Sequence, residues 1–244
     1  MQADWPILVL TLDGDDTRRQ PLLDQLDAAG LPWQLFFGVD GRRGLTAEYL
    51  PLIDREAAQR RLKRPMTDAE FACALSHRKI YQTILERGLA GAVVLEDDAI
   101  LTPDFAAFLQ AGLHRVDSMA LLDYRFGRAL PWQRRRAGRW WLYRAAQRAT
   151  LTSAYTVSRR SAQDLLAATT PVSFAADWPA DLYELRAWLV VPRVAQHNEP
   201  GQGPSHLADA RSGVEARTKD AGRYLDADYW RGLLRRKLAR KVGR

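Results

Sequence analysis

Ala92-Val93-Val94-Leu95-Glu96-Asp97-Asp98 decides the fold of this chain, because an apolar run ends there directly in three consecutive carboxylates. A short apolar run of this kind is typical of a buried strand. Adjacent acids repel one another, and the repulsion costs stability unless a positive group lies beside them. A hard divalent cation, bound by carboxylate oxygens and by a substrate's phosphates, is a common partner. The alternative is an ordinary strand that ends in a solvated acidic turn.

Strand-like and helix-like segments alternate on both sides of this stretch. Before it we expect a strand at 7–12, a helix at 18–29 and a second strand at 35–41, which together form one β-α-β unit. Thr67 and Glu70 have the spacing of a capping box, which predicts a helix from there to about Arg87. Further strands are expected at 119–124 and 151–158, and further helices from 102 onward and at 161–168.

This alternation predicts an α/β fold, with a single Rossmann-type domain whose mostly parallel sheet is flanked by helices. A chain of 244 residues is long enough for one such domain with a sizeable core. After Pro192 the sequence becomes polar and rich in Gly and Pro, and its periodicity fades. We therefore place the domain at residues 1–200 and a polar, then basic, C-terminal tail at residues 201–244.

The composition is ordinary for a globular protein, with 47% hydrophobic and 27% charged residues. No window approaches the run of about 18 apolar residues that a membrane span needs. No basic segment precedes the apolar run from Trp5 to Leu12, so a secretory signal is not expected. Cys73 is the only cysteine, which excludes an intrachain disulfide and a multi-cysteine zinc site and fits a reducing compartment. These features predict a cytoplasmic protein.

The net charge of +7 comes from two segments that contain no acid. Residues 125–148 hold eight arginines, and residues 231–244 hold seven lysines or arginines. In the second segment leucines recur at helical spacing among the cations, which is typical of a helix on an anionic membrane surface; the alternative is a solvated basic end. In the first, Arg134-Arg135-Arg136 lies near Trp132, Trp140 and Trp141, a combination suited to a phosphorylated or acidic saccharide and equally to nucleic acid.

The segment Glu70-Phe71-Ala72-Cys73-Ala74-Leu75-Ser76-His77-Arg78-Lys79-Ile80-Tyr81, together with Val94 to Asp98, resembles glycosyltransferase family 25. This family includes the bacterial lipooligosaccharide galactosyltransferases and the collagen galactosyltransferases. Further pieces resemble the family in the same order: Leu10-Thr11-Leu12 with Arg18-Arg19, Val39-Asp40-Gly41-Arg42, and Thr152 to Arg159. The resemblance covers roughly residues 5 to 192 and implies a GT-A-like fold.

The resemblance also implies a role for each acid of the strand tip. When a nucleotide sugar is cleaved, negative charge grows on the leaving diphosphate, and a divalent cation stabilises that charge. Glu96-Asp97-Asp98 fits the acidic-x-Asp pattern of GT-A enzymes, which makes Asp98 a ligand of Mn²⁺ or Mg²⁺ and places Glu96 toward the ribose or the metal's water shell. Asp97 alternates to the opposite side of the strand, as a structural residue beside the donor. His197 is a further candidate ligand for the metal or a phosphate; the alternative is an exposed loop histidine.

Candidate donor-binding residues come from the first strand and from two helices. Arg18 and Arg19 stand near a helix start, where backbone N–H groups favour an anion and a guanidinium can hold a diphosphate bidentately; the alternative is a solvated helix face. Thr11 lies in the matching end of the first strand. Ser76 and His77 match the family's serine-histidine pair, which implies a position near the nucleotide or the metal; the alternative is a core histidine.

Cys73 and His77 lie four residues apart, hence on one face of the predicted helix. A nucleophilic Cys-His pair is one interpretation, but it lacks a third group to orient the histidine. We favour a small buried hydrophobic residue at Cys73.

The family's reaction inverts the anomeric centre, which calls for a carboxylate base that deprotonates the acceptor hydroxyl. The base is expected after the late strand and helix, where Asp177 and Asp181 lie in the acidic stretch. Asp177 is the first choice, because Trp178 beside it would stack on a sugar ring, and Asp181 is the second. The alternative is that one of them caps a helix that Pro179 begins.

We therefore predict a metal-dependent inverting glycosyltransferase. It would move a hexose, galactose, from a UDP-sugar to lipopolysaccharide core or another surface glycan, with a lipid-linked acceptor at the inner face of the membrane and peripheral attachment through the basic tail. One alternative is a nucleic-acid-binding protein that keeps the fold, which we disfavour because the acidic tip repels phosphate. Another is a catalytically silent scaffold for other transferases.

Overall fold

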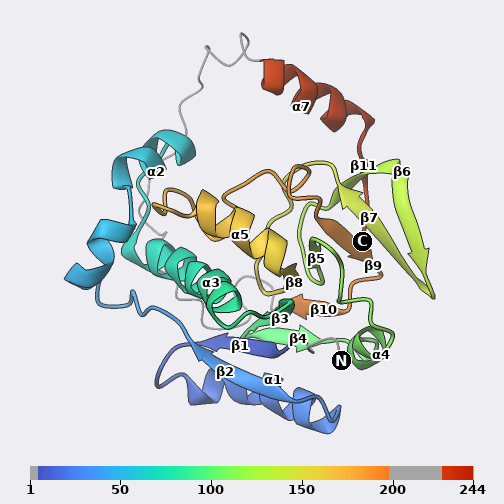
Figure 1. Ribbon diagram of the computed structural model, residues 1–244, viewed down its shortest axis with the longest axis horizontal. Helices are drawn as coiled ribbons and strands as arrows, with labels where there is room; N and C mark the ends of the chain where they lie inside the picture. Colours follow the sequence, from blue (N-terminus) through green and yellow to red (C-terminus); the bar gives the residue numbers. More distant parts are fainter. Residues whose placement is uncertain (1–4, 198–226, 244) are drawn as a thin grey trace.

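The computed structural model describes residues 5–197 and 227–243, which form a large sheet with helices on both faces (Figure 1). The sheet has nine strands in the order β11-β6-β7-β9-β5-β8-β3-β1-β2. These strands are β1 (Ile7–Thr11), β2 (Trp33–Phe37), β3 (Gly91–Glu96), β5 (Met119–Leu121), β6 (Arg128–Ala137), β7 (Trp140–Ala145), β8 (Ala154–Ser158), β9 (Trp188–Val191) and β11 (Arg240–Lys241). A separate two-stranded sheet consists of β4 (Ala99–Leu101) and β10 (Ala195–His197).

The helices cover the two faces of the large sheet and its ends. They are α1 (Asp16–Ala28), the 3-10 helix η1 (Ala47–Leu52), α2 (Arg55–Leu62), α3 (Asp68–Glu86), α4 (Phe105–Gln110), α5 (Arg159–Ala168) and α7 (Ala227–Leu238). Figure 1 shows α3 and α5 side by side on one face and α1 and α4 on the other side of the sheet.

The α/β class is confirmed, but the sheet is mixed, so the prediction of a mostly parallel sheet is wrong. Three pairings between neighbouring strands are parallel, β1 with β2, β1 with β3 and β5 with β9, and the remaining five are antiparallel. Parallel neighbours need a long crossover, which α1 and α3 supply. In contrast, β6 runs into β7 through the short turn Gly138-Arg139, and β8 enters antiparallel between β3 and β5.

The predicted helix before β3 forms as its capping box indicates. Thr67 Oγ1 accepts a hydrogen bond from the Glu70 N–H at 3.2 Å, and a Glu70 carboxylate oxygen accepts one from the Thr67 N–H at 3.0 Å. Arg64 holds the same carboxylate with two hydrogen bonds of 2.6 and 2.8 Å. These contacts fix where α3 begins. They therefore also fix the positions of Cys73 and His77 along the helix.

β3 lies between β1 and β8 and is buried on both faces. Ala92 and Val94 belong to the apolar cluster on the side of α3 and α5, while Val93 and Leu95 belong to the cluster on the side of α1 and α4. A strand buried on both faces must be apolar throughout, which explains the uninterrupted run. The run ends where the strand leaves the core, so the carboxylates emerge at the edge of the sheet.

Part of the predicted tail joins the large sheet. β11 pairs antiparallel with β6, with Arg240 opposite Ala129, and Arg235 of α7 pairs with Asp181. The predicted domain boundary at residue 200 lies outside the described residues. Among residues 5–197 and 227–243, none of the helices combines the length and the apolar character that crossing a bilayer requires.

Candidate active site

The carboxyl ends of β1 and β3 meet at one edge of the sheet, because the two strands are parallel neighbours. Leu10 of β1 lies opposite Glu96, the last residue of β3, and the Asp97 N–H donates to the Leu10 carbonyl at 3.0 Å. Asp97 and Asp98 form the turn into β4. The β1–α1 turn and the first residues of α1 therefore lie beside the three carboxylates, which we call the acidic tip.

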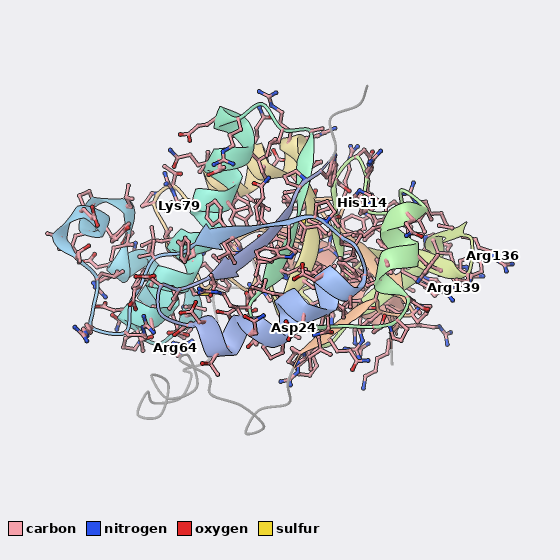
Figure 2. All side chains as sticks on the ribbon, turned by 90° about the horizontal axis from the view of Figure 1, so that it is seen from below. Asp24, Arg64, Lys79, His114, Arg136 and Arg139 are labelled. Carbon is pink, nitrogen blue, oxygen red and sulfur yellow. The ribbon has the colours of Figure 1, made fainter. Side chains whose placement is uncertain are left out.

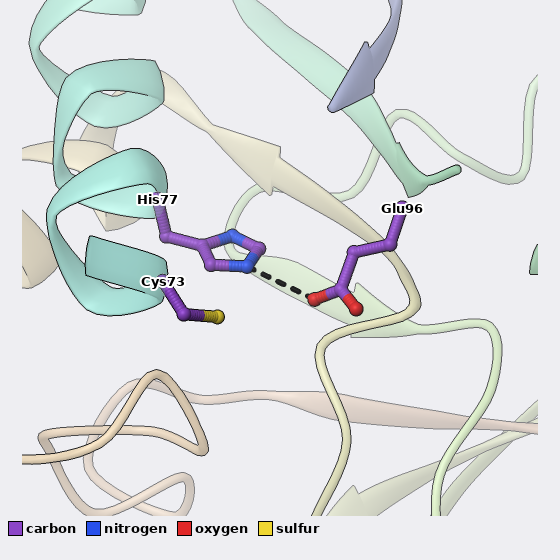
Figure 3. A group of neighbouring side chains, drawn as sticks. All are labelled: Cys73, His77 and Glu96. Carbon is purple, nitrogen blue, oxygen red and sulfur yellow. Dashed lines mark hydrogen bonds and ion pairs between the residues drawn. The ribbon is translucent and has the colours of Figure 1, made fainter. Parts of the chain in front are cut away.

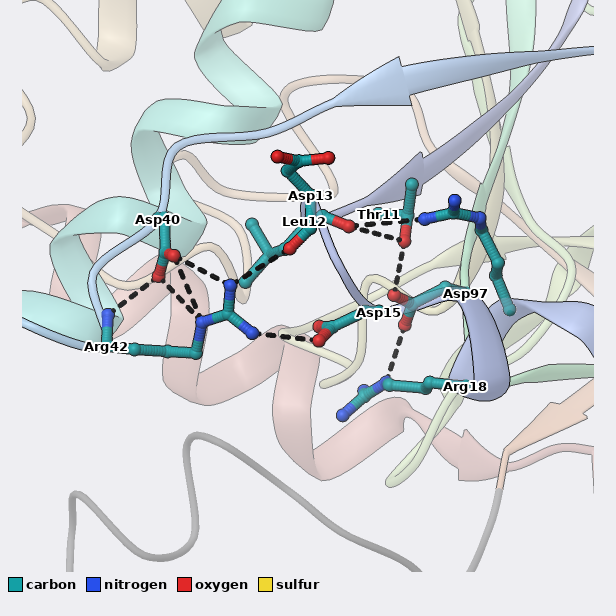
Figure 4. Close-up of polar contacts among 9 residues, drawn as sticks. Thr11, Leu12, Asp13, Asp15, Arg18, Asp40, Arg42 and Asp97 are labelled. Carbon is teal, nitrogen blue, oxygen red and sulfur yellow. Dashed lines mark hydrogen bonds and ion pairs between the residues drawn. The ribbon is translucent and has the colours of Figure 1, made fainter.

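Arg18 of α1 neutralises much of the acidic tip (Figure 4). Its Nε lies 2.7 Å from Asp97 Oδ1, and its Nη2 lies 2.7 Å from Asp98 Oδ2. Thr11 Oγ1 donates to the other oxygen of Asp97 at 2.9 Å. Burial alone would lower the pKa of Arg18, but the charges of Asp98 and Asp97 outweigh it and raise that pKa. The positive group that we expected beside the acidic tip is therefore in part the Arg18 guanidinium.

Asp98 remains short of positive charge even with Arg18 beside it. Burial and the neighbouring charge of Glu96 raise the pKa of Asp98 to about 6, although Arg18 opposes the shift. Burial also raises the pKa of Asp97, against the opposing effects of Arg18 and Thr11. A further cation at this edge would relieve both carboxylates.

A second network ties the segment after β2 to the β1–α1 turn (Figure 4). Arg42 donates to Asp40 at 2.8 and 3.0 Å, to Asp15 Oδ1 at 2.8 Å and to the Asp13 carbonyl at 3.1 Å. These contacts hold the turn that carries Arg18 into α1. They also give a structural role to the Val39–Arg42 stretch.

Glu96 ends a chain of buried hydrogen bonds that begins on α3 and β8. Its Oε1 accepts from Thr152 Oγ1 at 2.5 Å and lies 3.0 Å from His77 Nε2, and His77 Nδ1 lies 2.9 Å from the Tyr155 hydroxyl. Burial alone would raise the pKa of Glu96, but His77 and Thr152 lower it. An ionised Glu96 accepts hydrogen bonds only, so His77 Nε2 carries a proton.

Two predicted donor-binding residues are engaged inside the fold. Ser76 Oγ donates to the Ala72 carbonyl at 2.7 Å and accepts from the Val39 N–H at 2.8 Å. Arg19 pairs with Asp16 and donates to the Leu12 carbonyl at 3.3 Å. The structure therefore brings Thr11, Arg18 and His77 to the acidic tip, whereas Ser76 and Arg19 hold neighbouring elements together.

The two candidate bases lie in different places. Asp177 Oδ1 accepts from the Leu151 N–H at 2.9 Å, directly before Thr152, which binds Glu96. Asp181 accepts from the Tyr183 N–H at 2.8 Å and pairs with Arg235 of α7. Asp177 is thus connected to the acidic tip, and Asp181 to the basic C-terminal helix.

The expectation that Trp178 stacks on a sugar is wrong. Its ring is fully buried and packs edge-on against Tyr155, with 5.2 Å between the ring centroids. Trp178 therefore supports the Tyr155–His77 pair from within the core. The Asp177 carboxylate is held by the backbone N–H of Leu151 and not by the Trp178 indole.

His197 reaches the same edge through the small sheet, where it pairs with Ala99, the residue after Asp98. Its Nδ1 lies 2.7 Å from Asp123 Oδ2, and Asp123 also accepts from Ser153 Oγ at 2.8 Å. The Nε2 atom is buried and has no hydrogen-bond partner among the residues that the structure describes. An imidazole held by a carboxylate through one nitrogen is typical of metal-ligating histidines.

Sequence reasoning missed the residues that hold these side chains in place. Thr152 and Tyr155 lay within a stretch quoted for the family resemblance, but their contacts depend on the register of β8 beside β3. Asp123 had a readable signal, because it follows the apolar run Met119–Leu122 as the acidic tip follows its own strand. The run itself was predicted as a strand at 119–124, but Asp123 was given no functional role.

The structure contains a second group of metal-ligating side chains beside the tip. Cys73 Sγ, a His77 ring nitrogen and a Glu96 carboxylate oxygen all lie within 4.8 Å of one another (Figure 3). Cys73 is half-buried, whereas we favoured a small buried hydrophobic residue at this position.

The arginine-rich segment forms the β6–β7 hairpin, whose arginines lie over aromatic rings. Arg134 lies 4.7 Å from the Trp141 ring, Arg135 lies 4.9 Å from Trp188, and Figure 2 shows Arg136 and Arg139 at one end of the molecule. The tryptophans proposed to bind saccharide differ in exposure. Trp132 is 63% exposed, Trp140 is buried, and Trp141 is half-buried beneath arginine.

Comparison with known proteins supports the family resemblance seen in the sequence motifs. A family model described as "Glycosyltransferase family 25 (LPS biosynthesis protein)" matches residues 4–180, which include the acidic tip and Asp177 but neither Asp181 nor His197. A "Glycosyltransferase 25 family member" of Aedes aegypti is 32% identical over 106 residues, which cover 41% of this chain and 17% of the relative.

Two further relatives differ in what their names say of activity. "Probable inactive glycosyltransferase 25 family member 3" of Bos taurus is 30% identical over 122 residues, 47% of this chain and 20% of the relative. "Procollagen galactosyltransferase 1" of Danio rerio is 40% identical over 58 residues, 24% of this chain and 10% of the relative. The chain thus spans about a fifth or less of the length of these curated relatives.

Proposed function

The chain belongs to glycosyltransferase family 25, and from this premise we propose that it is a metal-dependent inverting glycosyltransferase with a GT-A-like domain. The donor would be a UDP-hexose, with galactose as the sugar. The observation that carries the proposal is the acidic tip, where Asp98 keeps a pKa of about 6 with Arg18 already beside it. The named galactosyltransferase among the relatives supports the choice of sugar.

The residues present fit a hard divalent cation, Mn²⁺ or Mg²⁺. Asp98 offers a carboxylate short of positive charge, and the buried Nε2 of His197 lacks a hydrogen-bond partner among the described residues. Glu96, at the end of β3, is close enough to Asp98 for its charge to raise the pKa of that carboxyl. Bound by Asp98, His197 and Glu96, the ion would stabilise the charge that grows on the leaving diphosphate.

The remaining contacts assign work to the chain's own side chains. Arg18 shares its guanidinium between Asp97 and Asp98, so a cation on Asp98 would release part of that guanidinium toward the diphosphate. Thr11 holds Asp97, and His77 holds Glu96 in the position that we assign to the ribose side of the donor.

Asp177 is the proposed base. Its backbone lies beside the buried Trp178, and its carboxylate is fixed by the Leu151 N–H next to Thr152. A carboxylate placed in this way would accept the proton of the acceptor hydroxyl as that hydroxyl attacks the anomeric carbon. Asp181, which pairs with Arg235, is the less suitable candidate.

The acceptor that we propose is a lipopolysaccharide-core or related saccharide at the cytoplasmic face of the membrane. α7 exposes Leu234 and Leu238, 61% and 47% exposed, together with Arg236 and Lys237. This pattern supports peripheral binding to an anionic surface. Nucleic acid is a weaker candidate, because arginines lie over the Trp141 and Trp188 rings and leave Trp132 as the exposed tryptophan of the hairpin.

Calorimetric titration of UDP, with and without Mn²⁺, tests the proposal. We expect binding by the wild type only with Mn²⁺ and none by Asp98→Ala. Asp164→Ala removes an exposed carboxylate of α5 and should bind as the wild type does. UDP release from UDP-galactose distinguishes an active enzyme from a silent scaffold. A UDP affinity that changes neither when Mn²⁺ is removed nor in Asp98→Ala would contradict the proposed site.

A further inference from the structure

Cys73, His77 and Glu96 bring three kinds of metal ligand together beside the acidic tip. Cys73 and His77 lie one turn apart on α3, and Glu96 faces them from the end of β3, with all three ligand atoms within 4.8 Å of one another (Figure 3). Modest side-chain movement would place these atoms around one ion. The group is thus drawn from two elements whose packing the core fixes.

Two of the three ligands are already oriented by neighbours that do not belong to the group. His77 is held through Nδ1 by the Tyr155 hydroxyl, and Glu96 is held by Thr152 Oγ1. Such outer contacts are typical of ligands in metal sites, because they fix the ring and the carboxylate before the ion arrives. His77 is buried, whereas Cys73 and Glu96 are half-buried, so an ion can enter from the solvent side.

The chemistry of the donor set selects the ion. Thiolate and imidazole ligands favour Zn²⁺ and similar borderline-soft ions, whereas Mg²⁺ and Mn²⁺ prefer oxygen. We propose that Cys73, His77 and Glu96 form a binding site for Zn²⁺, distinct from the hard-cation site at Asp98 but sharing Glu96 with it. Three protein ligands leave a fourth tetrahedral position for water. Binding releases the Cys73 thiol proton to solvent, and the proton of the neutral His77 ring moves from Nε2 to Nδ1, which then donates it to the Tyr155 hydroxyl oxygen.

Occupation of this site has a consequence that rests on the proposed function. A Zn²⁺ ion between His77 and Glu96 replaces their hydrogen bond and draws the Glu96 carboxylate toward α3, away from the donor side. Zn²⁺ therefore inhibits the Mn²⁺-supported reaction. The site gives the enzyme a sensitivity to thiol-binding metals through a residue, Cys73, that has no part in the proposed transfer.

Titration of the full chain with Co²⁺, a spectroscopic substitute for Zn²⁺, tests the site without reference to activity. The wild type should develop a thiolate-to-cobalt charge-transfer band and intense visible bands of a tetrahedral ion, and Zn²⁺ should bleach both. Cys73→Ser should lack the charge-transfer band, and His77→Gln should weaken binding by at least about tenfold. Asp98→Ala is the matched control and should keep the band. Absence of the band in the wild type, or equal Zn²⁺ affinity of wild type and Cys73→Ser, would overturn the proposal.

Inhibition provides a second readout. With Mn²⁺ present, Cys73→Ser should need at least about tenfold more Zn²⁺ for half-inhibition of UDP release, at an unchanged uninhibited rate. Equal Zn²⁺ sensitivity of the two proteins would contradict the inhibitory role. A protein that releases no UDP but shows the cobalt band refutes the proposed transferase function and leaves the Zn²⁺ site standing, so the two failures are distinguishable.

Discussion

The acidic tip and the β6–β7 hairpin both concentrate like charges, but the charges of the tip are paired by side chains of neighbouring elements, whereas those of the hairpin are exposed. At the tip each carboxylate has a side-chain partner on a neighbouring element, as Asp97 has Thr11 and Arg18. In the hairpin the arginines lie exposed over aromatic rings such as Trp141 and Trp188. Buried pairs act in a low effective dielectric and fix geometry, whereas exposed charges are screened and exchangeable. Under the proposed function, the first region carries the chemistry and the second is suited to hold an extended anionic saccharide.

The largest effect is expected when two acids are compared, Asp177, which is connected to the acidic tip, and Asp181, which pairs with the basic helix α7. Asp177→Asn should lower the rate of transfer by about 10²–10⁴-fold, because the base is lost while the contact with the Leu151 N–H is retained. Asp181→Asn changes only an exposed pair with Arg235 and should leave the rate within about twofold. Transfer is measured as acceptor-dependent UDP release. Equal losses in the two variants would break the comparison.

Arg18→Met tests whether the acidic tip depends on its guanidinium for stability. We expect a loss of about 2–3 kcal/mol in the free energy of unfolding, since Asp97 and Asp98 are left with less compensation. Added Mn²⁺ should restore part of this loss by binding the same carboxylates. Urea unfolding measures both effects.

Arg19→Met is the matched control for that prediction. Arg19 pairs with the exposed Asp16, and its contact with the Leu12 carbonyl is long at 3.3 Å. Its replacement should cost about 1 kcal/mol or less, with no rescue by Mn²⁺. If Arg19→Met is as destabilising and as metal-responsive as Arg18→Met, the special position of Arg18 is disproved.

Ser76→Ala probes a buried polar contact that holds the first region together. The substitution leaves the Val39 N–H without its acceptor, and we expect a loss of about 1–2 kcal/mol with little change in UDP affinity. Ser173→Ala, which removes an exposed contact with Arg61, should cost less than about 0.5 kcal/mol. Unfolding and calorimetry together separate this role from direct donor binding, which predicts a large loss of UDP affinity.

The smallest effect on stability is expected in the hairpin. Replacement of Arg134, Arg135 and Arg136 by Gln should change the free energy of unfolding by about 0.5 kcal/mol or less. The same variant should bind heparin, an extended anionic saccharide, more weakly than the wild type, and added salt should reduce the difference. Gln at Arg60, Arg159 and Arg160, which are exposed elsewhere, changes the net charge equally and serves as the control. Equal heparin binding by the two triple variants would refute a specific role of the hairpin.

The sequence was most informative where local chemistry decides structure. The apolar run of β3 and the capping box at Thr67 and Glu70 predicted their elements, because burial on both faces and reciprocal caps leave a local trace. The β6 strand left no such trace, since Arg134 to Arg136 face solvent and interrupt any apolar alternation. That segment was interpreted as a charge cluster, and the sheet was therefore predicted to be mostly parallel.

The partners of the acidic tip could not be predicted for a different reason. Arg18 and Asp97 are separated by 79 residues, and His77 and Tyr155 by 78, so their contacts depend on strand register and helix placement. The prediction that a positive group must lie near the tip was sound, but the chain supplies part of that charge itself. Trp178 was predicted to bind sugar, but its side chain is buried in the core.

The position of β8 beside β3 has a consequence for the order in which the chain is made. A ribosome that has delivered residues through β7 has already supplied the acidic tip, Arg18 and His77. Thr152, 56 residues after Glu96, and His197, on the strand beside Ala99, have yet to emerge. The growing chain therefore carries its three adjacent acids together with Thr11, Arg18 and His77 before Thr152 has been made. Completion of the proposed site is a late event in biosynthesis, because His197, one of its proposed metal ligands, is made only after most of the fold has been translated.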